Sequence, residues 1–186
     1  MPGECGSHKS HTTAFLNTSE VVRMALLRQF LSTVGDGTGT VNAAVDGSSV
    51  AANYKIVPAS GREYRIDSLT VFLEDNAALL GDAFAGATMT NGIRIQVLNG
   101  DDVATLNVDA GLAIKRIADF LQLGAVEMAD ASGTNKFKAY KLTFASPVVL
   151  NGSTPTRLNV KINDNISGAV LLKFLAEGIA RGQVTA

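Results

Sequence analysis

From residue 52 onward the chain is a series of short segments in which apolar and polar residues alternate, separated by Gly, Asn, Asp and Pro. Alternation with a period of two places the apolar side chains on one face of a strand, so each segment predicts a half-buried β-strand. These segments are 54–56, 64–73, 93–97, 140–144, 158–162 and 170–179. No regular alternation of strands and helices accompanies them. The pattern predicts a mainly β chain: a single antiparallel β-sandwich, jelly-roll-like, with one short helix.

Three local features refine this prediction. Tyr64 and Ile66 alternate on one parity and Leu69 continues on the other, which predicts a β-bulge near residues 67–68. The dipeptide Asn99-Gly100 predicts a hairpin turn after the 93–97 strand. Pro147 predicts the end of the 140–144 strand, because proline cannot donate to a ladder.

Two segments have apolar residues at helical spacing. In 112–123 the apolar positions share one helical face, and this is the short helix of the prediction. In 20–34, Val22, Leu26 and Phe30 also lie on one helical face. A strand is the alternative there, but Arg28 interrupts its apolar side, so periodicity favours a helix.

Residues 1–19 are polar and small, with little that could offset the entropy of ordering. We expect an extended N-terminal arm, flexible or docked on a partner, followed by a β-sandwich domain over 20–186. The first residues also lack the continuous apolar core of a secretory signal.

Charge and composition exclude several functions. The formal net charge of the 186 residues is −1, so no surplus of positive charge is available for sequence-independent nucleic-acid binding. No apolar stretch approaches the ~18 residues of a membrane span, and the lone Cys5 excludes an internal disulfide. Charged residues make up only 18%, which indicates surface buried against copies or partners.

Few residues offer metal or catalytic chemistry. Cys5, His8 and His11 could contribute to a zinc site, but the gap between the histidines is shorter than usual and a solvated tail is the better interpretation. The oxygen-rich segments 97–102 and 161–168 could hold calcium, although Asn and Asp are equally typical of turns. We predict no metal or cofactor.

An enzyme is equally disfavoured. His8 and His11 are the only histidines, so a nucleophile–histidine pair would stand on the arm. The carboxylates that could serve a glycosidase have no spacing that selects a pair. They are Glu63, Asp67, Glu74, Asp75 and Asp82. The segment GDGTGT at 35–40 lacks the lysine and the helix of a phosphate-binding loop, and we interpret it as a turn.

The basic residues form no patch with interleaved aromatic residues, which is a second argument against a nucleic-acid site. They are Arg23, Arg28, Arg62, Arg65, Arg94, Lys115 and Arg116.

Six segments in order carry a resemblance to a known group. The group's patterns and their places here are NxxxDGS at 42–48, a PAxGExY turn at 58–64, a strand ending at Glu74-Asp75, an LTNG turn represented by MTNG at 89–92, DG(I/L)xIK at 109–115 with Ala110 inserted, and LxVx(I/L)NDxxxGL represented by 158–171. Over about residues 37–172 the chain resembles virion structural proteins of tailed bacteriophages. The matching residues are turn signatures, and no catalytic residue carries over.

The resemblance implies a jelly-roll-like sandwich on the capsid surface of a virion, made in the cytoplasm of the bacterial host. Its expected role is that of a non-enzymatic cement (decoration) protein. Its expected partners are the major capsid protein and copies of itself, with a trimer favoured and with neither membrane nor specific nucleic acid involved. The same group would make 22–34 an added strand. Alternatives are a head–tail junction or tail protein, and a carbohydrate-binding sandwich of a tail fibre, which the absence of Trp disfavours.

Overall fold

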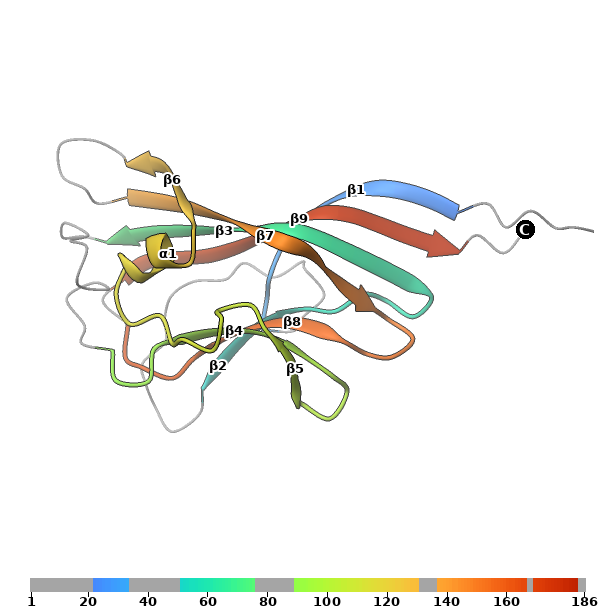
Figure 1. Cartoon of the computed structure of the whole chain (residues 1–186), viewed down its shortest axis with the longest axis horizontal. Coiled ribbons are helices and arrows are strands. Elements are labelled where there is room, and N and C mark those ends of the chain that lie inside the picture. Colours follow the sequence, from blue (N-terminus) through green and yellow to red (C-terminus); the bar gives the residue numbers. More distant parts are fainter. Residues whose placement is uncertain (1–21, 34–50, 76–88, 131–136, 167–168, 184–186) are drawn as a thin grey trace, which may run out of the picture.

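The computed structural model describes residues 22–33, 51–75, 89–130, 137–166 and 169–183, and these form two packed antiparallel sheets (Figure 1). The five-stranded sheet has the order β1 (Val22–Phe30), β9 (Ala169–Gln183), β3 (Arg62–Asp75), β7 (Phe137–Asn151) and β6 (Val126–Asp130). The four-stranded sheet has the order β2 (Ala52–Ile56), β8 (Arg157–Ile162), β4 (Ile93–Leu98) and β5 (Ala104–Asn107). The predicted mainly β sandwich is confirmed.

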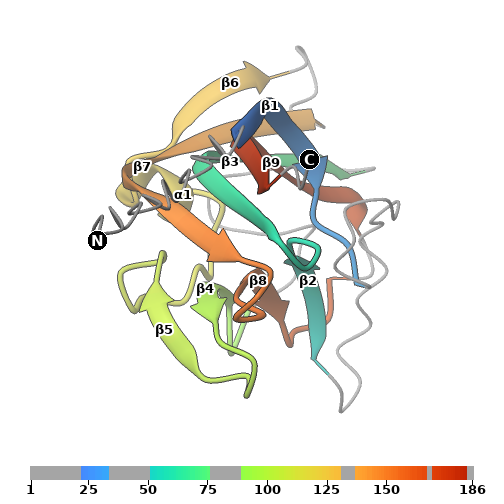
Figure 2. The same cartoon turned by 90° about the vertical axis from the view of Figure 1, so that its right-hand side faces the viewer.

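The strand order is that of a jelly roll. Four antiparallel pairs follow one another like the two arms of one long hairpin: β1 with β9, β2 with β8, β3 with β7, and, next to the hairpin's turn, the consecutive strands β4 and β5. Two further pairings, β3 with β9 and β4 with β8, roll this hairpin into two layers. Strand β6 is an addition beside β7. Figure 2 shows the two layers from one end.

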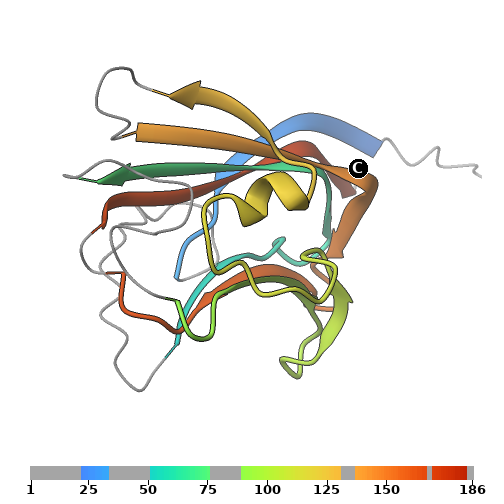
Figure 3. The ribbon, with the colours of Figure 1, turned by 60° about the vertical axis from the view of Figure 1, so that its left-hand side comes forward.

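The core fills the space between the layers with the inward side chains of both sheets. Ile66, Leu69 and Phe174 from one sheet and Ile95 and Val160 from the other are completely or almost completely buried. The helix α1 (Asp119–Gln122) lies between the ends of the two sheets (Figure 3). Its Phe120 stacks on Tyr140 with ring centroids 5.8 Å apart, which closes that end of the core.

The predicted β-bulge is present. The register of β3 shifts between Ile66 and Ser68 against both of its neighbours. Against β9, Asp67 is the extra residue, because Ile66 pairs with Gly178 and Ser68 with Glu177. On β9 the position opposite Ile66 is Gly178, where an added Cβ would collide with the carbonyl oxygen of Arg65. The bulge therefore brings the two backbones so close that only glycine fits.

The prediction of a helix over 20–34 is wrong, and the strand implied by the resemblance is correct. Residues 22–30 pair with β9 throughout. Leu27 is buried, whereas Leu26, on the expected apolar face of the helix, is 83% exposed. Apolar residues occupy both faces of β1, and this produced the helix-like spacing.

The helix predicted over 112–123 is reduced to α1, because Ile114 forms an antiparallel bridge with Ile93 instead. The turn after β4 is confirmed, although it closes as a longer loop with Asn99 accepting the N–H of Val103.

The predicted stop at Pro147 is wrong. Strand β7 continues past it, and its register against β3 jumps from Thr143 to Val148. Pro147 lies within this irregularity, where its missing N–H removes no hydrogen bond between the two strands.

Candidate functional site

The candidate glycosidase carboxylates lie along one strand. Glu63 and Glu74 are near opposite ends of β3, and a separation of eleven residues at ~3.3 Å per residue is far beyond the ~5–9.5 Å that a glycosidase pair needs. Asp67 forms an ion pair with Arg65 at 3.8 Å and Glu63 one with Arg181 at 3.7 Å. The structure brings no two of these described carboxylates together.

The oxygen-rich segment 161–168 holds a loop through Asp164. The carboxylate of Asp164 accepts the backbone N–H groups of Thr90 at 2.9 Å, Asn91 at 3.0 Å and Gly92 at 2.6 Å. Burial alone would raise the pKa of Asp164, but these donors outweigh it and hold the pKa below its ordinary value. The Asp164 oxygens, which calcium would have needed, are thus occupied by the protein's own backbone.

The other candidate calcium segment, 97–102, is a turn held by an amide. Asn99 accepts the backbone N–H groups of Asp101 at 3.0 Å and Val103 at 2.9 Å. Asp102 forms an ion pair with Arg157. Within the described part of the chain, no group of three or more His, Cys, Asp or Glu side chains is arranged to hold a metal ion.

Asp109, from the 109–115 segment, is a fully buried carboxylate with a structural role. It accepts Arg94 Nε at 2.7 Å and the backbone N–H groups of Ile95 and Gly111, each at 2.9 Å. The hydrogen bond to the Asp109 carboxylate raises the pKa of Arg94. It ties the β5–α1 connection to β4.

Several other sequence candidates lie outside the described residues. They are the 1–19 arm with Cys5, His8 and His11, the 35–40 segment, and Asp82. The basic residues are dispersed, as the sequence indicated: Arg28, Arg94 and Arg116 each pair with a different acid on a different element.

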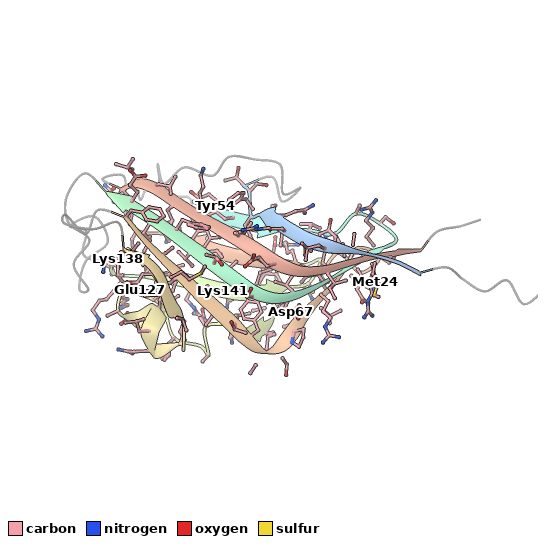
Figure 4. All side chains as sticks on the ribbon, turned by 90° about the horizontal axis from the view of Figure 1, so that it is seen from above. Met24, Tyr54, Asp67, Glu127, Lys138 and Lys141 are labelled. Carbon is pink, nitrogen blue, oxygen red and sulfur yellow. The ribbon has the colours of Figure 1, made fainter. Side chains whose placement is uncertain are left out.

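The outer face of the five-stranded sheet carries an ion cluster centred on Glu177. The Glu177 carboxylate accepts Lys141 Nζ at 2.9 Å and lies 3.5 Å from Arg28 Nε and 3.4 Å from Thr70 Oγ1. The Lys141 hydrogen bond is the main cause of a lowered pKa for Glu177, and burial works against it. Figure 4 shows this face and places Lys141 on it, away from the edge strand β1. The cluster links β1, β9, β3 and β7.

Aromatic side chains cross the same face beside the ion cluster. Phe72 lies between Phe30 and Phe137, with ring centroids 6.3 Å and 6.5 Å away. The ammonium of Lys173 lies 5.7 Å from the centroid of Phe30. This outer face is therefore partly apolar, and its aromatic side chains contact one another.

The two edge strands of this sheet expose apolar side chains. On β1, Met24 is 65% and Leu26 83% exposed, and on β6, Val126 is 67% and Met128 58% exposed. Among the described residues, no strand pairs with the outer edge of either. Figure 4 places Met24 at the start of β1, far from the Glu127–Lys138 pair on the opposite edge of the sheet. Sequence periodicity missed both features, because it treats an apolar residue as buried.

A polar groove of about 570 Å³ lies on the outer face of the four-stranded sheet. Its lining includes the amides Asn53, Gln96, Asn159 and Asn163 and the cations Lys55, Arg157 and Lys161. Asn159 is only 2% exposed and lies in the middle of the sheet, on β8. The alternating pattern predicted that these residues face outward. They lie close together only because β2, β8 and β4 pair with one another, and the pattern does not predict that pairing.

Comparisons with known protein families, with curated proteins and with solved structures find no match to this chain. Among the described residues, no helix is long and apolar enough to cross a membrane.

Proposed function

We propose that this chain is a non-enzymatic structural component of a tailed-phage particle, a capsid cement or decoration protein that binds major capsid protein subunits and copies of itself. The observation that carries the proposal is the exposure of Met24 and Leu26 on β1 and of Val126 and Met128 on β6. Exposed apolar residues on unpaired sheet edges are typical of surfaces that associate.

The resemblance of the turn signatures to phage virion proteins supports the same proposal. In the structure two of these signatures meet: Asp164, from the segment that starts at 158, holds the TNG turn. Jelly rolls also recur among viral capsid and lectin domains, an analogy at the level of fold alone.

The charges on the two edges favour a head-to-tail contact between copies. The charged residues of β1 are both basic, Arg23 and Arg28, and those of β6 are both acidic, Glu127 and Asp130. Two β1 edges would bring like charges together, whereas β1 of one copy against β6 of the next pairs opposite charges and can close a ring. The register shift between Glu127 and Ala129 disturbs backbone pairing on β6, so side chains provide the contact there.

The experiment is sedimentation of the full chain with empty heads of the phage that encodes it. We expect saturable binding, because a stable contact of this kind buries about 1,000 Å² or more. Leu26→Lys should remove most of the binding. The matched control is Leu112→Lys, which changes another exposed leucine, on a loop (62% exposed, against 83% for Leu26). This variant should bind as the wild type does. Heads that sediment without the chain would overturn the proposal.

A further inference from the structure

The polar groove on the four-stranded sheet has chemistry that the proposed assembly role does not use. Its floor is a row of side chains across the sheet, where Lys55 and Gln96 flank Asn159 in the register of β2, β8 and β4. The next row has Asn53 opposite Lys161. The residues that surround these rows come from the strand ends and the 99–103 loop.

Two cations of the groove have no counter-charge among the residues that the structure describes. Arg94, beside it, is neutralised by Asp109, and Arg157 by Asp102. Lys55 and Lys161 form no ion pair within the described part of the chain. They lie on neighbouring strands at diagonal positions, about 7 Å apart at their Cβ atoms. The groove therefore favours a ligand with negative charge, and more than one charge can be accommodated.

The amides supply both donors and acceptors. Asn159 donates to Asn53 at 3.1 Å and Gln96 donates to Asn107 at 2.8 Å. These bonds fix the orientation of the amides, and each amide has further hydrogen-bonding capacity that they do not use. A hydroxyl group both donates and accepts a hydrogen bond, so a row of amides can bind several hydroxyl groups of one ligand.

We propose that this groove binds an acidic saccharide, with its carboxylates on Lys55 and Lys161 and its hydroxyl groups on Gln96, Asn159 and Asn53. A neutral sugar would rely on aromatic stacking, and none of the described residues that line the groove is aromatic. An extended peptide adds to a sheet through an open edge, whereas the backbone groups below this groove are used within the sheet itself.

This inference goes beyond the proposed assembly role and is independent of it. The groove is on the layer opposite the β1 and β6 edges, so both surfaces can be occupied together (Figure 1). Failure of capsid binding would leave the saccharide proposal intact, and the reverse also holds.

The test is isothermal titration of the full chain with tetragalacturonate, with its fully methyl-esterified form, and with hexaglutamate. We expect binding of tetragalacturonate that weakens as salt increases, and much weaker binding of the ester. Lys55→Gln and Lys161→Gln should each reduce the affinity by roughly fivefold to tenfold. Lys115→Gln removes the same charge outside the groove and should leave the affinity unchanged.

Three results would overturn the proposal. Equal binding of the ester and the acid would show that the lysines do not recognise carboxylates. Lysine-dependent binding of hexaglutamate in preference to the saccharide would assign the groove to an acidic protein segment. No binding of tetragalacturonate at millimolar concentration would make the groove an ordinary solvated face. Unchanged thermal unfolding of the variants ensures that each result reports on the groove.

Discussion

The carboxylate of Asp164 accepts the backbone N–H of Gly92 at 2.6 Å across 72 residues of sequence. This contact joins the end of β8 to the start of β4, where the two neighbouring strands meet their loops. Gly92 has a φ of +77°, and an added Cβ would approach Ala113 Cβ and Ile114 O to 2.9 Å each. The turn is therefore determined by one carboxylate and one glycine.

The pH dependence of stability should report the Asp164 contact. Because the folded-state pKa of Asp164 is lowered, its contribution is present above the unfolded pKa of ~3.9 and is lost as pH falls through the folded value. Asp164→Asn should cost about 2 kcal/mol at pH 7 and less at pH 3, measured by urea unfolding. An equal cost at both pH values would contradict the assigned role.

Removal of one partner from the buried ion pair should be costly. Arg94→Met leaves the fully buried Asp109 with backbone donors alone, and we expect a loss of about 3 kcal/mol in the free energy of unfolding. Arg65→Met, which removes an exposed pair with Asp67, should cost less than ~1 kcal/mol and serves as the control. Similar losses in both variants would show that the burial of Asp109 is unimportant.

Glycine is required opposite the bulge of β3. Gly178→Ala places a Cβ against the carbonyl oxygen of Arg65 and should destabilise the fold by about 2 kcal/mol. Gly182→Ala, on the same strand, meets only Arg62 Cγ at 4.0 Å and should change stability by less than ~0.5 kcal/mol. Thermal unfolding of the two variants measures the difference, and equal melting temperatures would refute this account of the bulge.

Mixing experiments should distinguish a head-to-tail contact from a symmetric one. Leu26→Lys damages the β1 edge and Val126→Lys the β6 edge, and each variant alone should be monomeric. An equimolar mixture retains one intact contact, β1 of one variant with β6 of the other, and should form a dimer that cannot grow. Size-exclusion chromatography with light scattering reads this directly. A mixture that stays monomeric would contradict the head-to-tail geometry.

The sequence predicted strands best where one face is buried and the other is polar. Strands β4 and β8 follow this pattern, with Ile93, Ile95, Leu158 and Val160 all buried. Strand β5 escaped prediction because all four of its residues are exposed. Strand β1 has apolar residues at helical spacing because Met24 and Leu26 are apolar and yet exposed. Periodicity reports the apolar character of a residue, and not its burial.

The candidate site depended on long-range pairing, which spacing along the chain does not encode. The 161–168 segment suggested oxygen ligands for calcium, but its Asp164 is taken by donors of the 90–92 turn. The groove residues Lys55, Gln96 and Asn159 come together only through the register of three strands. Each was an unremarkable polar residue in its own segment.

Light scattering on the purified full chain tests the central claim, association through the exposed sheet edges, most directly. The account predicts a closed oligomer, with a trimer of the 19.4 kDa chain favoured, that Leu26→Lys converts to monomer and Leu112→Lys leaves intact. A wild-type chain that remains at 19.4 kDa across all concentrations, with and without empty heads, would contradict it.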